Sequence, residues 1–172
     1  MLNLHEESNA RDRLLVQTRS HHVQLSVMAD VKANIMLTLS SLVLTFSFRY
    51  LNDPILRWPV VVMIIFCIIT IVVAAYAVMP KISSGKGPSA NKSKNLLFFG
   101  NFIHMDYEEY AEKMDHVLSE TNAVYEAQVR EVYEMGVFLG QKKYRFVRLA
   151  YISFISGLVS SGLVLVGMQF FI

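Results

Sequence analysis

The chain has 172 residues and a formal net charge of +2, and 53% of its residues are hydrophobic while only 17% are charged. Its mean hydropathy of +0.39 argues against a soluble protein, and the roughly one hundred residues left outside a bilayer are too few for a kinase, Rossmann or barrel domain. A single cysteine, Cys67, excludes both a disulfide framework and a multi-cysteine zinc site.

The first predicted helix continues from the N-terminal region into a membrane. Neither Gly nor Pro occurs over residues 8–50, so this stretch can form one helix with Ser8 or Asn9 as its N-cap. The uncharged part is short, about 24 Å at 1.5 Å per residue, and therefore needs flanking side chains that extend to the interface. We expect residues 1–32 to form a cytoplasmic helix that is continuous with a transmembrane helix over residues 33–51.

Two further stretches are uncharged and long enough to cross a bilayer, which takes about 20 apolar residues. The first covers residues 60–79, between Pro59 and Pro80, and proline is typical of the first turn of a helix or of the position just past its end. The other covers residues 149–172. The sequence therefore predicts an all-α integral membrane protein with three transmembrane helices.

Residues 80–148, between the second and third spans, are predicted to form a cytoplasmic linker and a helical sensor region. Residues 81–95 are rich in Ser, Gly, Lys and Asn and indicate a linker, and Asp106 or its neighbour opens an acidic helix. From about Thr121, side chains recur in alternating steps of four and three, as in a helix packed on another helix: Tyr125, Val129, Val132, Gly136, Leu139, Lys143, Phe146 and Ala150. Because this pattern runs into the third span, we expect long cytoplasmic helical extensions that form a stalk.

The distribution of basic residues predicts the orientation. Ten basic residues stand near span ends on the side of the N-terminus and of residues 80–148, against two, Arg49 and Arg57, on the other side. Basic residues are enriched on the cytoplasmic side of membrane proteins. We therefore expect a multi-pass membrane protein with the N-terminus and residues 80–148 in the cytoplasm and the C-terminus on the opposite side of the membrane.

Two groups of residues suggest more than a membrane anchor. Charged residues gather where the helices meet the membrane, and converging cations could hold an anion there, although ordinary interfacial anchoring explains most of them: Asp30, Lys32, Lys143, Arg145 and Arg148. Small residues recur every four positions in the third span, at Ser153, Gly157 and Ser161. This face favours close helix approach, either within the chain or between copies of it.

The sequence contains no clear motif for catalysis or for a metal. Adjacent histidines, His21 and His22, point about 100° apart on a helix and do not chelate a metal well, and no Glu-x-x-His motif occurs. The acidic residues of the helix after Asp106 lack a nucleophile or an orienting base beside them. We therefore expect a protein that is not an enzyme, binds no metal or cofactor and has no nucleic-acid partner.

Several short motifs keep their order over about residues 20–155. They are Ala29-Asp30-Val31-Lys32-Ala33; Phe98-Phe99-Gly100-Asn101-Phe102 followed by Glu109-Tyr110; and Tyr125-Glu126-Ala127-Gln128-Val129-Arg130 with Tyr133, Gly136, Leu139, Lys143-Tyr144 and Ala150-Tyr151. Together they resemble the transmembrane effectors of the Pycsar anti-phage system.

The resemblance implies membrane damage triggered by a ligand. In that family, a cyclase made alongside the effector produces a cyclic pyrimidine mononucleotide upon phage infection. The effector then impairs the inner membrane, and the cell dies or stops growing before phage mature. The resemblance thus implies cyclic CMP or cyclic UMP as the activating ligand, membrane lipid as a further partner, and abortive infection as the outcome. It also implies a location in the bacterial inner membrane, with the C-terminus in the periplasm. Because three spans cannot enclose an aqueous channel by themselves, membrane damage also implies a homo-oligomer.

The ligand site is predicted from the residues alone. A cyclic mononucleotide carries one negative charge and a flat base, so it asks for a cation and an aromatic face. Tyr125, Arg130 and Tyr133 are the best such group on one helix, with Phe99 and Asn101 as base contacts from the preceding segment. A packed stalk helix with an exposed arginine is the alternative interpretation.

Two other functions are compatible with the same residues. One is a non-enzymatic membrane scaffold whose cytoplasmic helical stalk binds a protein partner. The other is a small enzyme that cleaves phospholipids or nucleotides, although no catalytic constellation is visible for it. The sequence leaves open which cyclic nucleotide is sensed, how many subunits assemble, and whether the damage is a pore or a general disruption of the bilayer.

Overall fold

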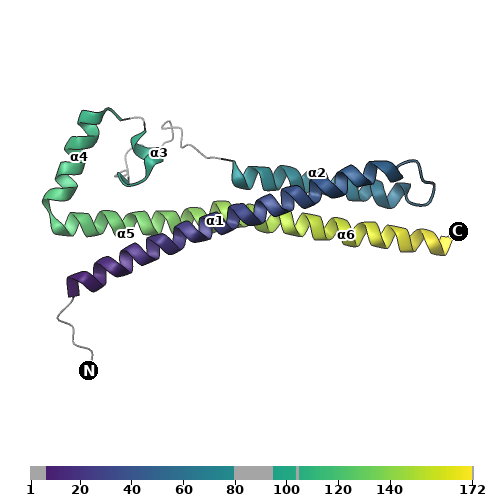
Figure 1. Ribbon diagram of the computed structural model, residues 1–172, viewed down its shortest axis with the longest axis horizontal. Helices are drawn as coiled ribbons and strands as arrows, with labels where there is room; N and C mark the ends of the chain where they lie inside the picture. The colour runs from purple at the N-terminus through teal and green to yellow at the C-terminus, as the bar shows by residue number, and fades with distance from the viewer. Residues whose placement is uncertain (1–6, 80–94, 104, 172) are drawn as a thin grey trace, which may run out of the picture. The chain divides into compact units, whose positions relative to one another are not determined.

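The computed structural model describes residues 7–79, 95–103 and 105–171, and every regular element in these ranges is helical (Figure 1). The longer elements are α1 (Glu7–Ser47), α2 (Arg57–Val78), α4 (Tyr107–Ser119), α5 (Thr121–Phe138) and α6 (Arg145–Phe171). The shorter ones are a 3-10 helix, η1 (Phe48–Tyr50), the helix α3 (Phe99–Phe102) and a π-helix, η2 (Leu139–Tyr144).

Three helical stretches are long and apolar enough to cross a membrane: Ala10–Tyr50, Arg57–Val78 and Thr121–Phe170. In a bilayer a helix satisfies its own backbone hydrogen bonds, which an isolated strand or an irregular segment cannot do. The predicted fold class, an all-α integral membrane protein with three spans, is confirmed.

The N-terminal helix is continuous, as predicted, but it starts earlier than expected. Helix α1 begins at Glu7, so Ser8 and Asn9 lie inside its first turn, and the prediction that one of them is the N-cap is wrong.

The turn between the first two spans is organised by one carboxylate. Oδ1 of Asp53 accepts hydrogen bonds from the backbone N–H groups of Ile55, at 2.8 Å, and Leu56, at 3.0 Å. Helix α2 therefore begins at Arg57, three residues before the predicted start of the second span. Asp106 directly precedes α4, as predicted, whereas Pro80 and nearly all of the predicted linker over residues 81–95 lie outside the described residues.

The chain forms two compact units. One comprises Met1–Gln24 and Pro80–Phe138, and the other comprises Leu25–Met79 and Leu139–Ile172. The second unit, called the membrane unit below, contains most of α1 together with α2, η2 and α6. The first, called the polar unit, contains the start of α1 together with α3, α4 and α5.

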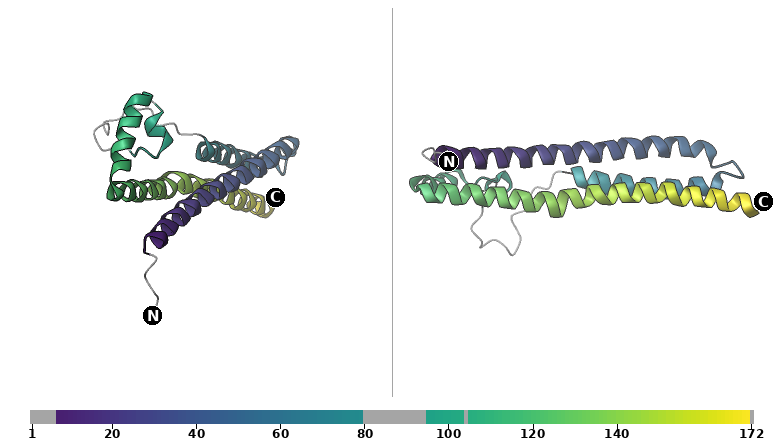
Figure 2. Two further views of the ribbon diagram at one scale, coloured as in Figure 1. Left: turned by 60° about the vertical axis from the view of Figure 1, so that its left-hand side comes forward. Right: turned by 90° about the horizontal axis from the view of Figure 1, so that it is seen from below.

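In the membrane unit the three spans lie along one another, and the C-terminal end of α6 lies at the same end as the turn between α1 and α2 (Figures 1 and 2). The buried positions are mostly small and recur at helical spacing: Ala29, Ala33, Met36 and Ser40 on α1; Met63, Cys67, Thr70, Ala74 and Ala77 on α2; and Val147, Ala150 and Gly157 on α6. Small side chains let helix backbones approach closely, which is the main source of packing energy between helices in lipid.

The predicted small face of the third span packs against α2 within the chain. Ser161 donates its hydroxyl to the Pro59 carbonyl at 2.9 Å, and Ser153 donates to the Phe66 carbonyl at 3.4 Å. Between them, a Cβ placed on Gly157 would lie only 2.5 Å from Cβ of Phe66. These three residues therefore hold α2 and α6 together in the described arrangement.

The helix that leads into the third span contains a π-helix, which the sequence pattern did not predict. The pattern placed Phe146 on the packed face, and Phe146 is half-buried there, with its ring edge-on to Tyr76. Val147, which the pattern did not include, is buried as well. The π-helix η2 has i→i+5 bonding, which adds one residue to its turn. Ala150 is nevertheless buried, as the pattern predicted.

Replacing Gly157 by alanine should destabilise the membrane unit. The new methyl group would overlap Phe66, and overpacking of this kind costs about 1–3 kcal/mol. Thermal unfolding in detergent micelles, followed by circular dichroism, should show a lower midpoint for Gly157→Ala. Gly162→Ala is the matched control, because nothing lies within 4 Å of a Cβ at that position. Equal midpoints for the two variants would contradict the close contact between α2 and α6.

Candidate functional site

The aromatic residue at the start of the predicted ligand group bonds to the first helix. The hydroxyl of Tyr125 on α5 donates to Oδ1 of Asp12 on α1 at 2.7 Å. This hydrogen bond is the largest of the effects that raise the pKa of the Tyr125 phenol. The structure thus gives Tyr125 a role in joining the two helices of the polar unit.

The three members of the predicted group are spread around α5. Arg130 follows Tyr125 by five residues, which is about 140° around a helix, whereas Tyr133 lies about 60° from Arg130. The guanidinium of Arg130 donates to Glu126 one turn earlier, at 2.8 Å. The side chain of Tyr133 is 70% exposed. Tyr133 is about 80° from Tyr125 and so lies between the other two around the helix axis. Arg130 and Tyr133 share an accessible side of α5.

The segment before α4 is attached to α5 through an asparagine that the sequence analysis did not single out. Buried Asn95 donates its side-chain amide to Glu134 of α5 at 3.2 Å. Its own backbone carbonyl accepts the side-chain amide of Asn101 at 3.0 Å, and its side-chain oxygen accepts the N–H of Leu97. Asn101 thus stabilises the fold of this segment by bonding within it. Phe99 begins α3, and its side chain lies outside the described parts.

A buried carboxylate is the second feature that sequence reasoning missed. Glu131 is only 8% exposed and pairs with Arg19 of α1 at 3.1 Å. By contrast Val129, which the heptad pattern placed on the packed face, is 54% exposed, so that part of the predicted stripe is wrong. The ion pair explains the difference, because a paired glutamate can face inward while the valine turns outward. The sequence does place Glu131 beside the apolar stripe, which could have suggested a buried carboxylate. Whether Glu131 faces inward depends on its partner, Arg19, which the pattern does not reveal.

One turn from Arg19, His22 packs against a glycine of α5. A Cβ added to Gly136 would lie 3.3 Å from Cε1 of the imidazole. Nδ1 of His22 is buried, with no hydrogen-bond partner among the described residues. Gly136, which was predicted for the packed stripe, thus leaves room for the His22 ring.

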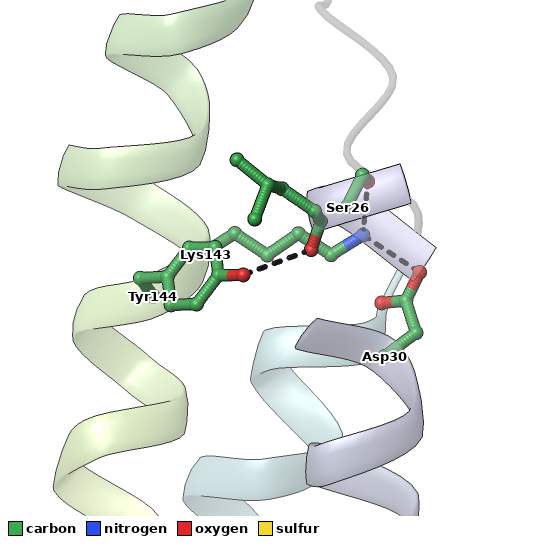
Figure 3. Close-up of polar contacts among 5 residues, drawn as sticks. Ser26, Asp30, Lys143 and Tyr144 are labelled. Atoms are coloured by element: carbon green, nitrogen blue, oxygen red, sulfur yellow. Dashed lines mark hydrogen bonds and ion pairs between the residues drawn. The ribbon is translucent and has the colours of Figure 1, made fainter. Parts of the chain in front are cut away.

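At the membrane boundary, the predicted charged residues divide into one ion pair and several exposed cations. Nζ of Lys143 lies 2.7 Å from Oδ2 of Asp30 and 2.7 Å from Oγ of Ser26 (Figure 3). Lys32, Arg145 and Arg148 are exposed and have no carboxylate partner within the described ranges. The charge of Lys143 is therefore neutralised by α1 of the same chain. The three other cations are available to lipid phosphates or another anion.

Within the described ranges, no three or more His, Cys, Asp or Glu side chains are grouped so that they could hold a metal ion. Cys67, the lone cysteine, is buried between the spans. The polar unit therefore offers ion pairs and hydrogen bonds between helices, together with one accessible aromatic and cationic side of α5. These are the means to bind a small anion and to change how helices pack.

The Arg19–Glu131 pair should contribute to the stability of the polar unit. Arg19→Met and Glu131→Gln should each lower the local free energy of unfolding by about 1–2 kcal/mol, since the carboxylate is buried although the guanidinium is largely exposed. A double-mutant cycle, measured by hydrogen exchange of α5 amides, should give a coupling of about 1 kcal/mol. The exposed Glu109–Lys113 pair on α4 is the control and should give about 0.5 kcal/mol or less. A coupling no larger than the control's would contradict a structural role for Glu131.

A comparison with protein families matches residues 13–169 to the Pycsar effector protein domain, PycTM. The match covers nearly the whole chain, and the chain belongs to this family. No curated protein and no solved structure matches it. The family supports the role of an anti-phage effector, which is what the order of motifs along the sequence predicted.

Proposed function

We propose that this Pycsar effector senses a cyclic pyrimidine mononucleotide, cyclic CMP or cyclic UMP, and in response impairs the bacterial inner membrane, so that infection is abortive. The observation that carries the proposal is the match to the effector family over residues 13–169, which includes all three apolar helices. Two of the spans are continuous along the chain with helices of the polar unit. The start of α1 belongs to the polar unit, and α6 follows α5 directly through η2. A ligand on the polar unit can therefore act on the spans without a separate partner.

The proposed orientation places the polar unit in the cytoplasm, where a cyclase would release its product. The basic residues near the span ends support this orientation through the positive-inside rule. Arg57 and Trp58 begin α2 at the opposite end, with the guanidinium carbon 5.7 Å from the ring centroid. An exposed tryptophan beside an arginine is typical of a membrane–water interface.

For the nucleotide we propose the accessible side of α5, with Arg130 as the cation for the cyclic phosphate and Tyr133 as an aromatic face for the base. Tyr125, Phe99 and Asn101 remain predicted contacts. Arg130 already has a carboxylate neighbour in Glu126. On binding a phosphate, Arg130 would replace its charge-assisted hydrogen bond to Glu126 by bonds to the phosphate. Its guanidinium can donate two such bonds to one phosphate at once.

The output requires several copies, because three packed spans leave no room for an aqueous channel. Of the two contacts predicted for Ser153, Gly157 and Ser161, within the chain or between copies, the structure has the first, because α2 occupies them in the described arrangement. For the same reason a leucine at Gly157 would disturb the chain's own packing. We propose that copies of this chain assemble in the lipid bilayer, and that the exposed cations at the boundary hold lipid phosphates.

The purified protein in detergent should bind cyclic CMP or cyclic UMP saturably, and isothermal titration should detect it. Arg130→Ala should weaken binding about tenfold or more, since a charge-assisted hydrogen bond is worth about 1.5–3 kcal/mol. Lys113→Ala, which removes an exposed cation of α4, is the control and should bind as the parent does. No binding of either nucleotide would favour the scaffold, and formation of a nucleotide product would favour an enzyme. Unchanged binding by Arg130→Ala would contradict the site.

A periplasm-active reporter fused after Ile172 should be active, and the same reporter inserted near Lys86 should be silent, because the basic bias places these positions on opposite sides of the membrane. Alkaline phosphatase activity in whole cells is the measurement, and immunoblotting controls for the amount of each fusion. The reverse pattern would place the polar unit in the periplasm and contradict a cytoplasmic sensor.

A further inference from the structure

Helix α6 is preceded by a π-helix, η2, which lies in the membrane unit. In a π-helix the backbone bonds span five residues instead of four, so the turn holds one residue more than an α-helical turn. An uninterrupted α-helix would therefore place every residue of α6 about 100° further around the helix axis. Such insertions are rare and occur frequently at functional sites. Since an α-helix is the ordinary state, specific contacts must stabilise η2.

Two hydrogen-bonded contacts to α1 hold η2. Lys143, whose side chain is only 12% exposed, reaches both Asp30 and Ser26 at 2.7 Å (Figure 3). The next residue, Tyr144, donates its hydroxyl to the backbone carbonyl of Leu25 at 3.1 Å. Two consecutive residues of η2 thus bond to the same neighbouring helix. These contacts lie where both helices from the polar unit enter the membrane unit, α1 at Leu25 and the other helix at Leu139.

The sequence of α6 offers a second register. If η2 became α-helical, each residue would take the place now held by the residue after it. Ser160 would then occupy the place of Ser161 against α2, and Ser156 would occupy the place of Gly157. Ser161 itself would move to the place of Gly162, where nothing lies within 4 Å of a Cβ. Serines would therefore stand at these two places, but Leu149 would take the place of buried Ala150 and Ile152 that of Ser153. The serine that now bonds to α2, Ser161, would turn outward.

The second register cannot keep the present distance between α2 and α6. Even a bare Cβ at the place of Gly157 would lie 2.5 Å from Cβ of Phe66, and a serine there is larger. Helix α6 would have to withdraw from Phe66 when it rotates. The π register thus goes with a closely packed bundle, and the α register goes with a loosened bundle that turns a hydroxyl toward lipid.

We propose that η2 is a register switch and that the Lys143–Asp30 ion pair holds it in the resting, π-helical state. Loss of the pair converts the turn to α-helix, rotates α6 and loosens the three spans. This proposal rests on the proposed function, because it supplies the step between a bound nucleotide and an impaired membrane. A nucleotide would act by binding the α-helical state more tightly than the π-helical state.

The first experiment removes the ion pair in cells that lack any nucleotide cyclase. Lys143→Met keeps the length of the side chain but not its charge, and it should depolarise the inner membrane without nucleotide, as a voltage-sensitive dye reports. Lys142→Met is the matched control, because Lys142 is exposed and makes no ion pair in the described parts, and these cells should keep their potential. A quiet Lys143→Met protein at the parental expression level would overturn the proposal.

A second variant separates switching from simple misfolding. Deleting Gln141, an exposed residue of η2, removes the extra residue and leaves α6 in its resting register with an α-helical turn. The deletion should abolish depolarisation when cyclic CMP or cyclic UMP is supplied, while nucleotide binding persists. Combined with Lys143→Met, it should restore the membrane potential. A combined variant that still depolarises the membrane would overturn the switch.

The register itself can be read without reference to function. In a Cys67→Ala background, Ser161→Cys should react with a maleimide more slowly than Ser160→Cys, because Ser161 faces α2. Adding Lys143→Met should reverse this order in isolated membranes, by mass spectrometry. An unchanged order would overturn the switch. A reversed order in a protein that binds neither nucleotide would support the switch and contradict the proposed function.

Discussion

Close contact between α2 and α6 is the constraint on which the membrane unit depends. Lipid tails are as apolar as the side chains of the spans, so burial alone gives the helices little reason to associate, and they must gain energy from contact at short range. Gly157 allows this contact by leaving room for Phe66, while Ser153 and Ser161 hydrogen-bond to carbonyls of α2 on either side of it. The hydroxyls are satisfied across the interface, which is favourable because no water is present to satisfy them.

A second constraint acts at the boundary of the apolar region, where a charge must be neutralised or reach water. Lys143 is too buried to reach water freely, and its charge is instead met by Asp30 and Ser26 of α1. Tyr144, the next residue of η2, bonds to the same helix. The charged boundary and the packing of α6 are therefore linked, since the turn that satisfies Lys143 also sets which face of α6 meets α2. This linkage is the basis of the register switch that we propose.

The polar unit uses different interactions for the same purpose of joining helices. Asp12, Arg19 and His22 of α1 meet Tyr125, Glu131 and Gly136 of α5 in three successive contacts. Each contact is a hydrogen bond, an ion pair or a ring against a glycine, and none is a large apolar cluster. Polar contacts of this kind are individually worth about 1 kcal/mol, so a small charged ligand can compete with them. This modest stability suits the sensor that we propose, because the helices of the polar unit are continuous along the chain with the spans.

The sequence by itself determined the helices, the three spans and the family, because each rests on local or cumulative properties: uncharged runs of sufficient length, the absence of helix breakers, and an ordered set of motifs. It also marked Asp30, Lys143 and the Ser153, Gly157 and Ser161 face as unusual. Only the tertiary structure decided what they contact: Lys143 has a partner in Asp30, and the small face packs against α2. It also decided that Glu131 faces inward and Val129 outward, since the partner that permits this, Arg19, is more than one hundred residues away in the chain. The π-helix escaped prediction for the same reason, because the bonds that stabilise it come from another helix.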